Sequence, residues 1–137
     1  MTDIGEAAIS HCDYLRYLIL PNSVTHLAVD ACSSNHSLGT LKVPGSVMSL
    51  PDYVFADCSF LTKVTIASGV TNISPLAFVS SAKIQELSIS KTVDKITAGT
   101  FRHCFNLRSV ELSYFTDVED GAFPDSCTIT RTGLTIR

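Results

Sequence analysis

The chain has 137 residues, of which 45% are hydrophobic and 17% are charged, and its formal net charge is −3. This length and composition indicate one globular domain, residues 1–137, with a core of its own. A small negative charge argues against a nucleic-acid-binding protein, which carries a basic excess, and the sequence has no apolar run of about 18 residues that would span a membrane.

Residues 1–20 lack the features of a signal peptide. Asp3 and Glu6 stand where a signal peptide carries Lys or Arg, and polar residues interrupt the apolar stretch that follows. We therefore expect the chain as given to stay in the cytoplasm, with the cell surface as the alternative if a leader is missing.

One apolar pattern recurs along the whole chain about every 23 residues. The repeats begin at Ile4, Leu27, Leu50, Ile73, Ile96 and Val118. Five residues after each start lies a set that we call the phenylalanine column: Ile9, Cys32, Phe55, Phe78, Phe101 and Phe123. Eight residues after each start lies the cysteine column: Cys12, Asn35, Cys58, Ser81, Cys104 and Ser126. Further columns are also apolar in nearly every repeat, and in the sixth repeat they fall on Ile129, Thr132 and Leu134.

The third repeat shows how each unit is expected to fold. Residues 61–66, LTKVTI, alternate apolar and polar side chains toward their end, which predicts a short strand with one buried face. Residues 67–69 are expected to form a turn, as the equivalent PNS, PGS and SKT do in other units. Residues 70–73, VTNI, then form a second short extended piece.

A compact helical turn is expected to close each unit. In residues 74–78, SPLAF, Ser74 is the expected N-cap and Pro75 the first helical residue. Thr97 is the expected cap of the equivalent turn in the next unit.

One such unit is too short to enclose its own apolar side chains, but stacked units can cover one another. Neighbouring strands would then lie about 4.8 Å apart. The sequence therefore predicts one right-handed solenoid of six coils, made mainly of short parallel strands with short helical or 3-10 turns. The inward residues of the third coil are Phe55, Cys58, Leu61, Val64 and Ile66.

These columns resemble a known family. The strand phrase L-x-x-L-x-L is similar to that of leucine-rich repeats, and the segments CDYLRYLILPNSV, VFADCSFLTKVTI and TFRHCFNLRSVEL resemble the BspA-like, or Treponema-type, subclass. The resemblance covers residues 4–134. It implies a leucine-rich-repeat fold, binding to other proteins and no cofactor, as in surface adhesins of bacteria and parasitic protozoa.

The five cysteines are expected to be structural. Cys12, Cys58 and Cys104 lie in alternate coils, about 9–10 Å apart, which is too far for a disulfide between them. They are expected to be small buried side chains. A bridge between Cys104 and Cys127, on neighbouring coils, is left open. Asn35 shares the cysteine column and is expected to form buried hydrogen bonds.

The sequence predicts neither a metal site nor an enzyme. His11 and His103 lie beside cysteines but four coils apart, so the pairs cannot converge on one zinc ion. Residues 117–125, DVEDGAFPD, lack the ligand spacing of a calcium loop and are expected to form a solvated rim. No nucleophile or phosphate-binding motif is present, although a site assembled from several coils stays open as an alternative.

Between the inward residues of each strand lie residues that face outward. Two such columns are expected to line one face of the sheet. The first contains Tyr17, Thr40, Lys63, Glu86, Ser109 and Arg131, and the second contains Ile19, Lys42, Thr65, Ser88, Glu111 and Gly133. This face is either a plain solvated surface or a protein-binding surface. The candidate partner-binding residues are Arg16, Tyr17, Ile19, Lys42, Lys63, Thr65, Glu86, Ser88, Glu111 and Arg131.

Two features favour the binding interpretation. Tyr17 and Ile19 would form an exposed aromatic–aliphatic pair near one end, which suits an anchor for a partner. Arg16, Lys42 and Lys63 lie in the early repeats and Glu86 and Glu111 in the later ones, which suits a partner of complementary charge. Arg108 and Arg131, in later repeats, weaken this separation.

The ends of the array have no visible polar caps, and Ile129, Leu134 and Ile136 would lack a cover. The chain is therefore either part of a longer array or associates weakly with itself through its ends. We expect a protein–protein interaction module, adhesive or scaffolding, that binds neither nucleic acid nor a cofactor. The alternatives are a purely structural, self-assembling repeat unit and an enzyme with an unrecognised site.

Overall fold

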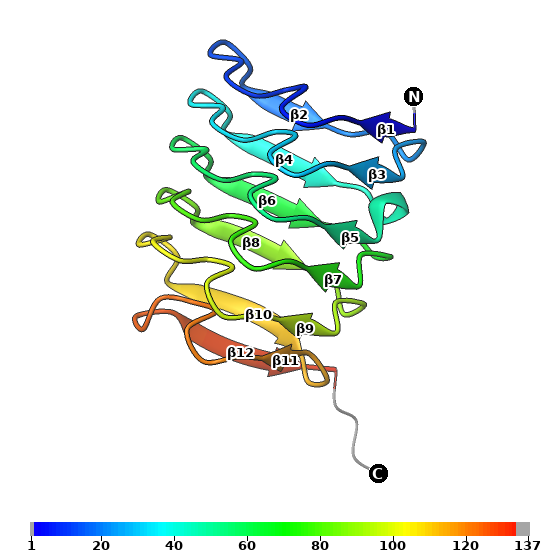
Figure 1. The fold of residues 1–137 in the computed structure, drawn as a ribbon. Helices are drawn as coiled ribbons and strands as arrows, with labels where there is room; N and C mark the ends of the chain where they lie inside the picture. Colours follow the sequence, from blue (N-terminus) through cyan, green and yellow to red (C-terminus); the bar gives the residue numbers. More distant parts are fainter. Residues whose placement is uncertain (1, 134–137) are drawn as a thin grey trace.

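The structure, a computed structural model, describes residues 2–133. The chain winds into coils that stack one upon the next, and Figure 1 shows the first coil at the top and the last at the bottom. One strand from each coil joins a six-stranded parallel sheet, in the order β2-β4-β6-β8-β10-β12. We call it the front sheet, a name that does not refer to the view in any figure. These strands are β2 (Tyr17–Ile19), β4 (Thr40–Val43), β6 (Lys63–Ile66), β8 (Glu86–Ile89), β10 (Ser109–Ser113) and β12 (Thr128–Thr132).

Two-residue strands form a second parallel set beside the front sheet, which we call the short ladder (Figure 1). One part pairs β1 (Asp3–Ile4) with β3 (His26–Leu27). The other part contains β5 (Ser49–Leu50), β7 (Asn72–Ile73), β9 (Lys95–Ile96) and β11 (Asp117–Val118). A 3-10 helix, η1 (Gly45–Val47), lies between β4 and β5. The predicted solenoid class, with six coils of about 23 residues, is confirmed.

Stacked phenylalanine rings fill the interior. The ring centroids of Phe55, Phe78, Phe101 and Phe123 follow one another at 5.4, 5.2 and 5.1 Å, with interplanar angles of 21°, 11° and 5°. Each coil advances by about one strand spacing, so equivalent side chains must lie almost directly upon one another. The predicted phenylalanine column is therefore confirmed.

The cysteine column is a hydrogen-bonded column as well as a packed one. The Asn35 amide donates to the carbonyl oxygen of Ile9 at 2.7 Å, and its Oδ1 accepts from the Cys12 backbone N–H at 2.8 Å. Further along the stack, the Ser81 hydroxyl donates to the carbonyl of Phe55 at 3.0 Å. The thiols of the column contact the equivalent carbonyls at 3.5–3.6 Å: Cys58 that of Cys32 and Cys104 that of Phe78. The buried hydrogen bonds expected of Asn35 are present.

The expected helical turn at residues 74–78 is wrong. This segment and the residues just after it form β-turns, in which Leu76 and Ser80 adopt left-handed φ values of 66° and 63°. Ala77 N–H closes the first turn on the carbonyl of Ser74, with Pro75 at the second turn position. Thr97 likewise bonds Thr100 instead of capping a helix.

The neighbouring coil explains why a helix does not form. The N–H of Phe78 donates to the carbonyl of Thr100 at 3.2 Å, and that of Ser80 donates to the carbonyl of Arg102 at 3.0 Å. A helix would use these same N–H groups within its own segment. The N–H groups therefore alternate in their use. Those of Ala77 and Val79 close local turns, and those of Phe78 and Ser80 donate to the next coil.

The register of the last strand also differs from the prediction. Through β8, each strand residue pairs with the residue 23 positions later, as Lys63 does with Glu86. In β12, Ser109 pairs with Thr128 and Leu112 pairs with Arg131. Arg131 and Thr132 are thus not in the columns expected of them, and Leu134 lies outside the described residues.

The shift changes which residue lies opposite the last inward-facing apolar side chains, although Ile129 itself remains 37% exposed. It places Ile129 opposite the buried Val110, where the expected register would have put Thr132. The outward positions opposite Ser109 and Glu111 are then occupied by Thr128 and Thr130.

Candidate functional site

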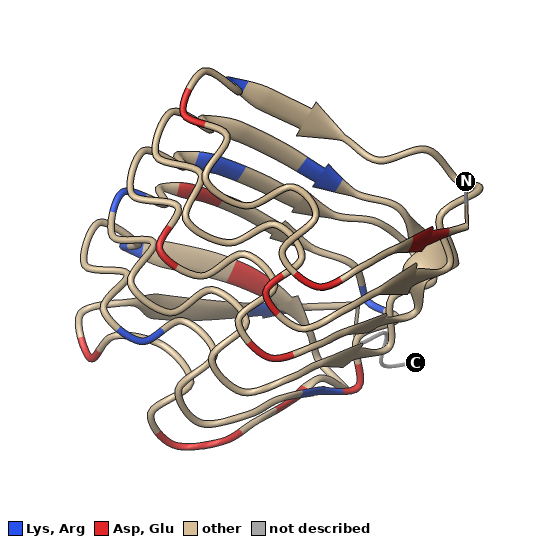
Figure 2. Cartoon of the chain, turned by 45° about the horizontal axis from the view of Figure 1, so that its top comes forward, with Lys and Arg blue, Asp and Glu red and all other residues tan. Residues whose placement is uncertain are grey.

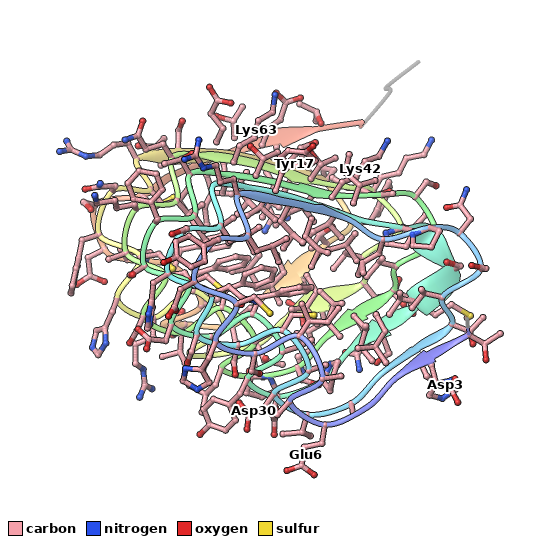
Figure 3. The ribbon with its side chains drawn as sticks, turned by 90° about the horizontal axis from the view of Figure 1, so that it is seen from above. Asp3, Glu6, Tyr17, Asp30, Lys42 and Lys63 are labelled. Carbon is pink, nitrogen blue, oxygen red and sulfur yellow. The ribbon has the colours of Figure 1, made fainter. Side chains whose placement is uncertain are left out.

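The outward side chains of the front sheet form a continuous surface, which we call the strand face. Its cross-strand neighbours run through successive coils, as Tyr17 to Thr40 to Lys63 to Glu86 in one column and Ile19 to Lys42 to Thr65 to Ser88 to Glu111 in the other. Figure 3 shows Tyr17, Lys42 and Lys63 together on this side of the solenoid, away from Asp3, Glu6 and Asp30.

The structure brings most of the predicted partner-binding residues together here. Arg16 is exposed and directly precedes β2. Thr65 is half-buried, and the others on this face are exposed: Tyr17, Ile19, Lys42, Lys63, Glu86, Ser88 and Glu111.

Arg131 is the exception. It pairs with the inward-facing Leu112, and its guanidinium donates to the backbone carbonyls of Ser113 and Thr116. It therefore covers carbonyl groups at the end of the solenoid and does not extend the strand face.

Charge changes sign along the strand face. Arg16, Lys42 and Lys63 belong to the early coils, and Glu86 and Glu111 belong to the later ones. Arg108, exposed directly before β10, is a basic exception among the later coils. Figure 2 shows basic segments on the upper strands of the front sheet and acidic segments on the strands below them, with a further basic segment on the lowest strand, β12. The two signs meet where Lys63 Nζ lies 4.0 Å from a carboxylate oxygen of Glu86. Both side chains are largely exposed, so this pair adds little to stability and leaves the charges available to a partner.

An apolar patch lies at the basic end of the strand face. Tyr17 and Ile19 remain 67% and 64% exposed, although both lie in a strand. Exposed aromatic side chains on a rigid strand are suitable anchors for a protein partner, because their burial on binding costs little conformational entropy.

A seam divides the front sheet between β8 and β10. The ladder pairs only Ser88 with Glu111 there, whereas β6 and β8 share four residue pairs. Two open hollows, of about 830 and 410 Å³, flank this seam on the strand face, and both are lined by Leu87 and Glu111. The strand face is therefore hollowed on both sides of this seam, in its acidic half.

A second exposed group was not predicted from the sequence. Tyr14, Phe60 and Phe105 are 95%, 53% and 65% exposed, and they lie in the loops that lead into the front-sheet strands. We call these loops the loop edge. Lys83 Nζ lies 4.9 Å from the ring centroid of Phe60. Tyr14 and Phe60 both lie ten residues after the start of their repeats, at Ile4 and Leu50. An aromatic residue at the same repeat position is the sequence signal that could have identified them.

The cysteines form no disulfide, and the bridge between Cys104 and Cys127 is absent because both thiols are free. Burial raises the pKa of Cys32 and Cys104 to about 12 and that of Cys58 to about 11. These thiols are neutral near pH 7, so they are poor nucleophiles and poor metal ligands.

In the acidic segment 117–125, Glu119 binds residues of the preceding coil. A carboxylate oxygen of Glu119 accepts the Ala98 N–H at 2.9 Å, and the other lies 3.2 Å from Lys95 Nζ. The hydrogen bond from Ala98, followed by the contact with Lys95, lowers the pKa of Glu119. Glu119 thus joins two coils.

Within residues 2–133, no three His, Cys, Asp or Glu side chains lie together as a metal site would require. In the same part of the chain, no helix has the length and apolar character needed to cross a membrane.

The chain is similar to one family of repeat proteins. It matches the model described as a BspA type leucine rich repeat region (6 copies), over residues 1–108 and again over residues 25–135. Among curated proteins, none matches the chain closely enough to count as a relative.

Solved structures share the fold. A leucine-rich cell surface protein from Faecalibacterium prausnitzii A2-165 matches with a TM-score of 0.77 and 24% identity, over 97% of this chain and 30% of that one. A leucine-rich repeat protein from Eubacterium ventriosum ATCC 27560 matches with a TM-score of 0.79 and 24% identity, over 96% and 36%. One from Bacteroides ovatus ATCC 8483 has a TM-score of 0.58 and 19% identity, over 95% and 43%. The chain thus spans less than half the length of each of these three.

Proposed function

Because the chain belongs to the BspA-type leucine-rich repeat family, we propose that it is a protein-interaction module that binds another protein through its strand face. Repeats of this family generally serve protein interaction or form surface structures, and they are typically not enzymes. The partner would be a protein with an acidic part that meets the early coils and a basic part that meets the later ones. Adhesion and scaffolding are both compatible with such binding.

The arrangement of charge on the strand face is the observation that supports this proposal best. Side chains such as Lys42, Lys63 and Glu111 are held at strand spacing by the parallel ladder, so their positions are ordered before any partner arrives. Preorganised charges increase the association rate and discriminate between partners, even where each exposed pair contributes little affinity. Tyr17 and Ile19 add an apolar anchor at one end.

A charge exchange across the strand face tests the proposal. In the double variant Lys63→Glu with Glu86→Lys, both side chains stay exposed and can still pair at the same place, so the fold and the net charge are retained. We expect immobilised variant protein to lose the partner that wild type retains from a native extract, with an unchanged circular dichroism spectrum.

The matched control places the same kind of exchange away from the strand face. Glu6→Lys with Arg102→Glu changes two exposed residues in turn segments and also keeps the net charge. Figure 3 shows Glu6 on the side opposite Tyr17. Partner retention by this control, with loss in the Lys63 and Glu86 variant, supports the strand face. Equal retention by both variants contradicts it.

Self-association through the ends is a second candidate, supported by the terminal strand. All five residues of β12 are exposed, and within residues 2–133 this strand pairs only with β10. Unpaired backbone groups on an edge strand can pair with another chain. The N–H of Thr128 donates to the carbonyl of Arg108 in β10, so the N–H of the next residue, Ile129, faces the free edge. Ile129→Pro would remove that edge N–H, so sedimentation should show less association than for wild type if copies meet at this edge. Equal association of the two proteins would remove β12 from the interface; the segment 134–137 lies outside the described residues.

A further inference from the structure

We propose that a notch at the loop edge, beside Arg16 and Phe60, receives an apolar side chain from an acidic segment of the protein partner. The inference rests on the proposed function, because the notch adjoins the basic end of the strand face. It adds a defined contact and a defined chemistry for the segment that binds there.

The notch is formed by two small residues in the second coil. Ser37 and Gly39 occupy the positions that Tyr14 and Arg16 hold in the first coil, 23 residues earlier in the repeat. The third coil places Phe60 at the position equivalent to Ser37. The result is a hollow of about 420 Å³, lined by Arg16, His36, Ser37, Gly39 and Phe60.

Phe60 supplies the apolar wall. Its ring is 53% exposed, and its Cδ2 atom lies 4.0 Å from the place that a Cβ on Gly39 would occupy. Lys83 Nζ lies 4.9 Å from the ring centroid, which is within the range of a cation–π contact. An apolar side chain that entered the notch would cover this ring and remove it from water.

Arg16 supplies the polar rim. No carboxylate of residues 2–133 forms an ion pair with its guanidinium, whereas His36 Nε2 lies 3.5 Å from a carboxylate oxygen of Asp57. A guanidinium can bind a carboxylate through two parallel hydrogen bonds. Arg16 can therefore hold an acidic residue next to the one that fills the notch.

The surrounding charges favour an acidic segment. Arg16 on the first coil and Lys83 on the fourth are exposed cations beside the notch, and Lys83 contacts the Phe60 ring. The exposed carboxylates of Asp13 and Asp57 oppose them, and Asp57 already faces His36. Cations exceed free carboxylates here, so an acidic polypeptide fits this end better than a basic one.

Gly39 offers a way to close the notch without harming the fold. Its φ is outside the left-handed region, and the atoms nearest to an added Cβ would be the Arg16 carbonyl oxygen at 3.6 Å and Phe60 Cδ2 at 4.0 Å. Gln85 occupies the same repeat position in the fourth coil. Gly39→Gln should therefore fold normally and fill the hollow. Phe60→Ser, which copies Ser37, removes the apolar wall as a second variant.

The experiment uses amide NMR titrations of the whole chain with short synthetic peptides. The probes are an acidic peptide with one central phenylalanine, the same peptide with glycine in its place, a basic peptide with phenylalanine, and a single-stranded oligonucleotide. We expect the acidic phenylalanine peptide to shift the signals of His36, Gly39 and Phe60. Gly39→Gln and Phe60→Ser should each weaken its binding about tenfold or more.

Several outcomes would overturn the inference. They are equal binding of the glycine peptide, stronger binding of the basic peptide or the oligonucleotide, absence of binding by every probe, and binding that neither variant weakens. The Lys63→Glu and Glu86→Lys variant separates the two proposals. Loss of the native partner in that variant, with no effect of Gly39→Gln on the peptide, leaves the strand face standing and removes the notch.

Discussion

At the residue scale, one hydrogen-bond role explains why Cys, Ser and Asn replace one another in the cysteine column. Each of Asn35, Cys58 and Ser81 donates to a carbonyl group of the preceding coil, in the phenylalanine column. A carbonyl group buried between coils is costly without a donor. The column therefore selects small side chains that carry a donor, and the interpretation of its cysteines as merely small and apolar was incomplete.

The buried thiols should weaken the protein in alkali. Cys32, Cys58 and Cys104 have pKa values raised above the ordinary 9.0, so in the folded state they stay protonated where the unfolded chain ionises. The unfolded state then binds fewer protons, and the free energy of unfolding falls by about 1.4 kcal/mol per pH unit for each thiol. Urea midpoints should decrease from pH 9 to about 11.

A thiol-free core provides the control for this prediction. The triple variant Cys32→Ala, Cys58→Ser and Cys104→Ser retains small side chains, with serine as Ser81 already provides in the same column. Its urea midpoint should depend less on pH over the same range. An identical slope in the two proteins would assign the alkaline loss to other groups.

The phenylalanine column should carry a large share of the stability. Phe78 is fully buried between Phe55 and Phe101, so Phe78→Ala should lower the free energy of unfolding by about 3–5 kcal/mol. Phe105→Ala, at a 65% exposed position, should change it by about 0.5 kcal/mol or less. Urea denaturation measures both, and similar losses would contradict the stacked core.

At the element scale, the strands could be predicted from sequence and the turns between them could not. Alternating burial in strands such as β4 and β6 follows from side chains that point to opposite faces, which leaves a period of two in the sequence. The segment 74–78 is turned and not helical because the N–H of Phe78, like that of Ser80 just after the segment, bonds the next coil. Those acceptors lie 22 positions away in the sequence, so the competition is invisible within one repeat.

A close approach between two turns is another feature of the elements that only the structure shows. A Cβ on Gly45 would lie 1.9 Å from the carbonyl oxygen of Ser68 in the next coil. Gly45→Ala should therefore push the coils apart and cost about 1–3 kcal/mol. Gly39→Ala is the matched control, because its nearest contact is an ordinary 3.6 Å and it should cost about 0.5 kcal/mol or less. Thermal unfolding compares them, and equal Tm values would contradict the close packing of these turns.

At the scale of the whole molecule, the seam between β8 and β10 divides the stack unequally. Solenoid stability is roughly a sum of coil and interface contributions, so the thinnest interface should open first. We expect native-state hydrogen exchange to show β10 and β12 opening together at a lower free energy than β4 and β6. Exchange at one common free energy in all four strands would show that the seam is not a weak interface.

The candidate site was predictable as far as the repeat was regular. Columns through Tyr17, Lys63 and Glu111 follow directly from the 23-residue period. Arg131 was misplaced because the last coil has a shorter path to its strand than the period implies. The notch at Gly39 was missed because it depends on small residues lying between larger ones on two adjacent coils, which no single repeat displays.

Radical footprinting of the bound complex tests the central claim most directly, because it reads the exposure of individual side chains. Binding through the strand face predicts strong protection of Tyr17 and Ile19, which are 67% and 64% exposed in the free chain. Met48, 58% exposed beside the short ladder, should react equally in the free and bound states. Protection of Met48 with unchanged reactivity at Tyr17 and Ile19 would place the partner on another surface and contradict the account.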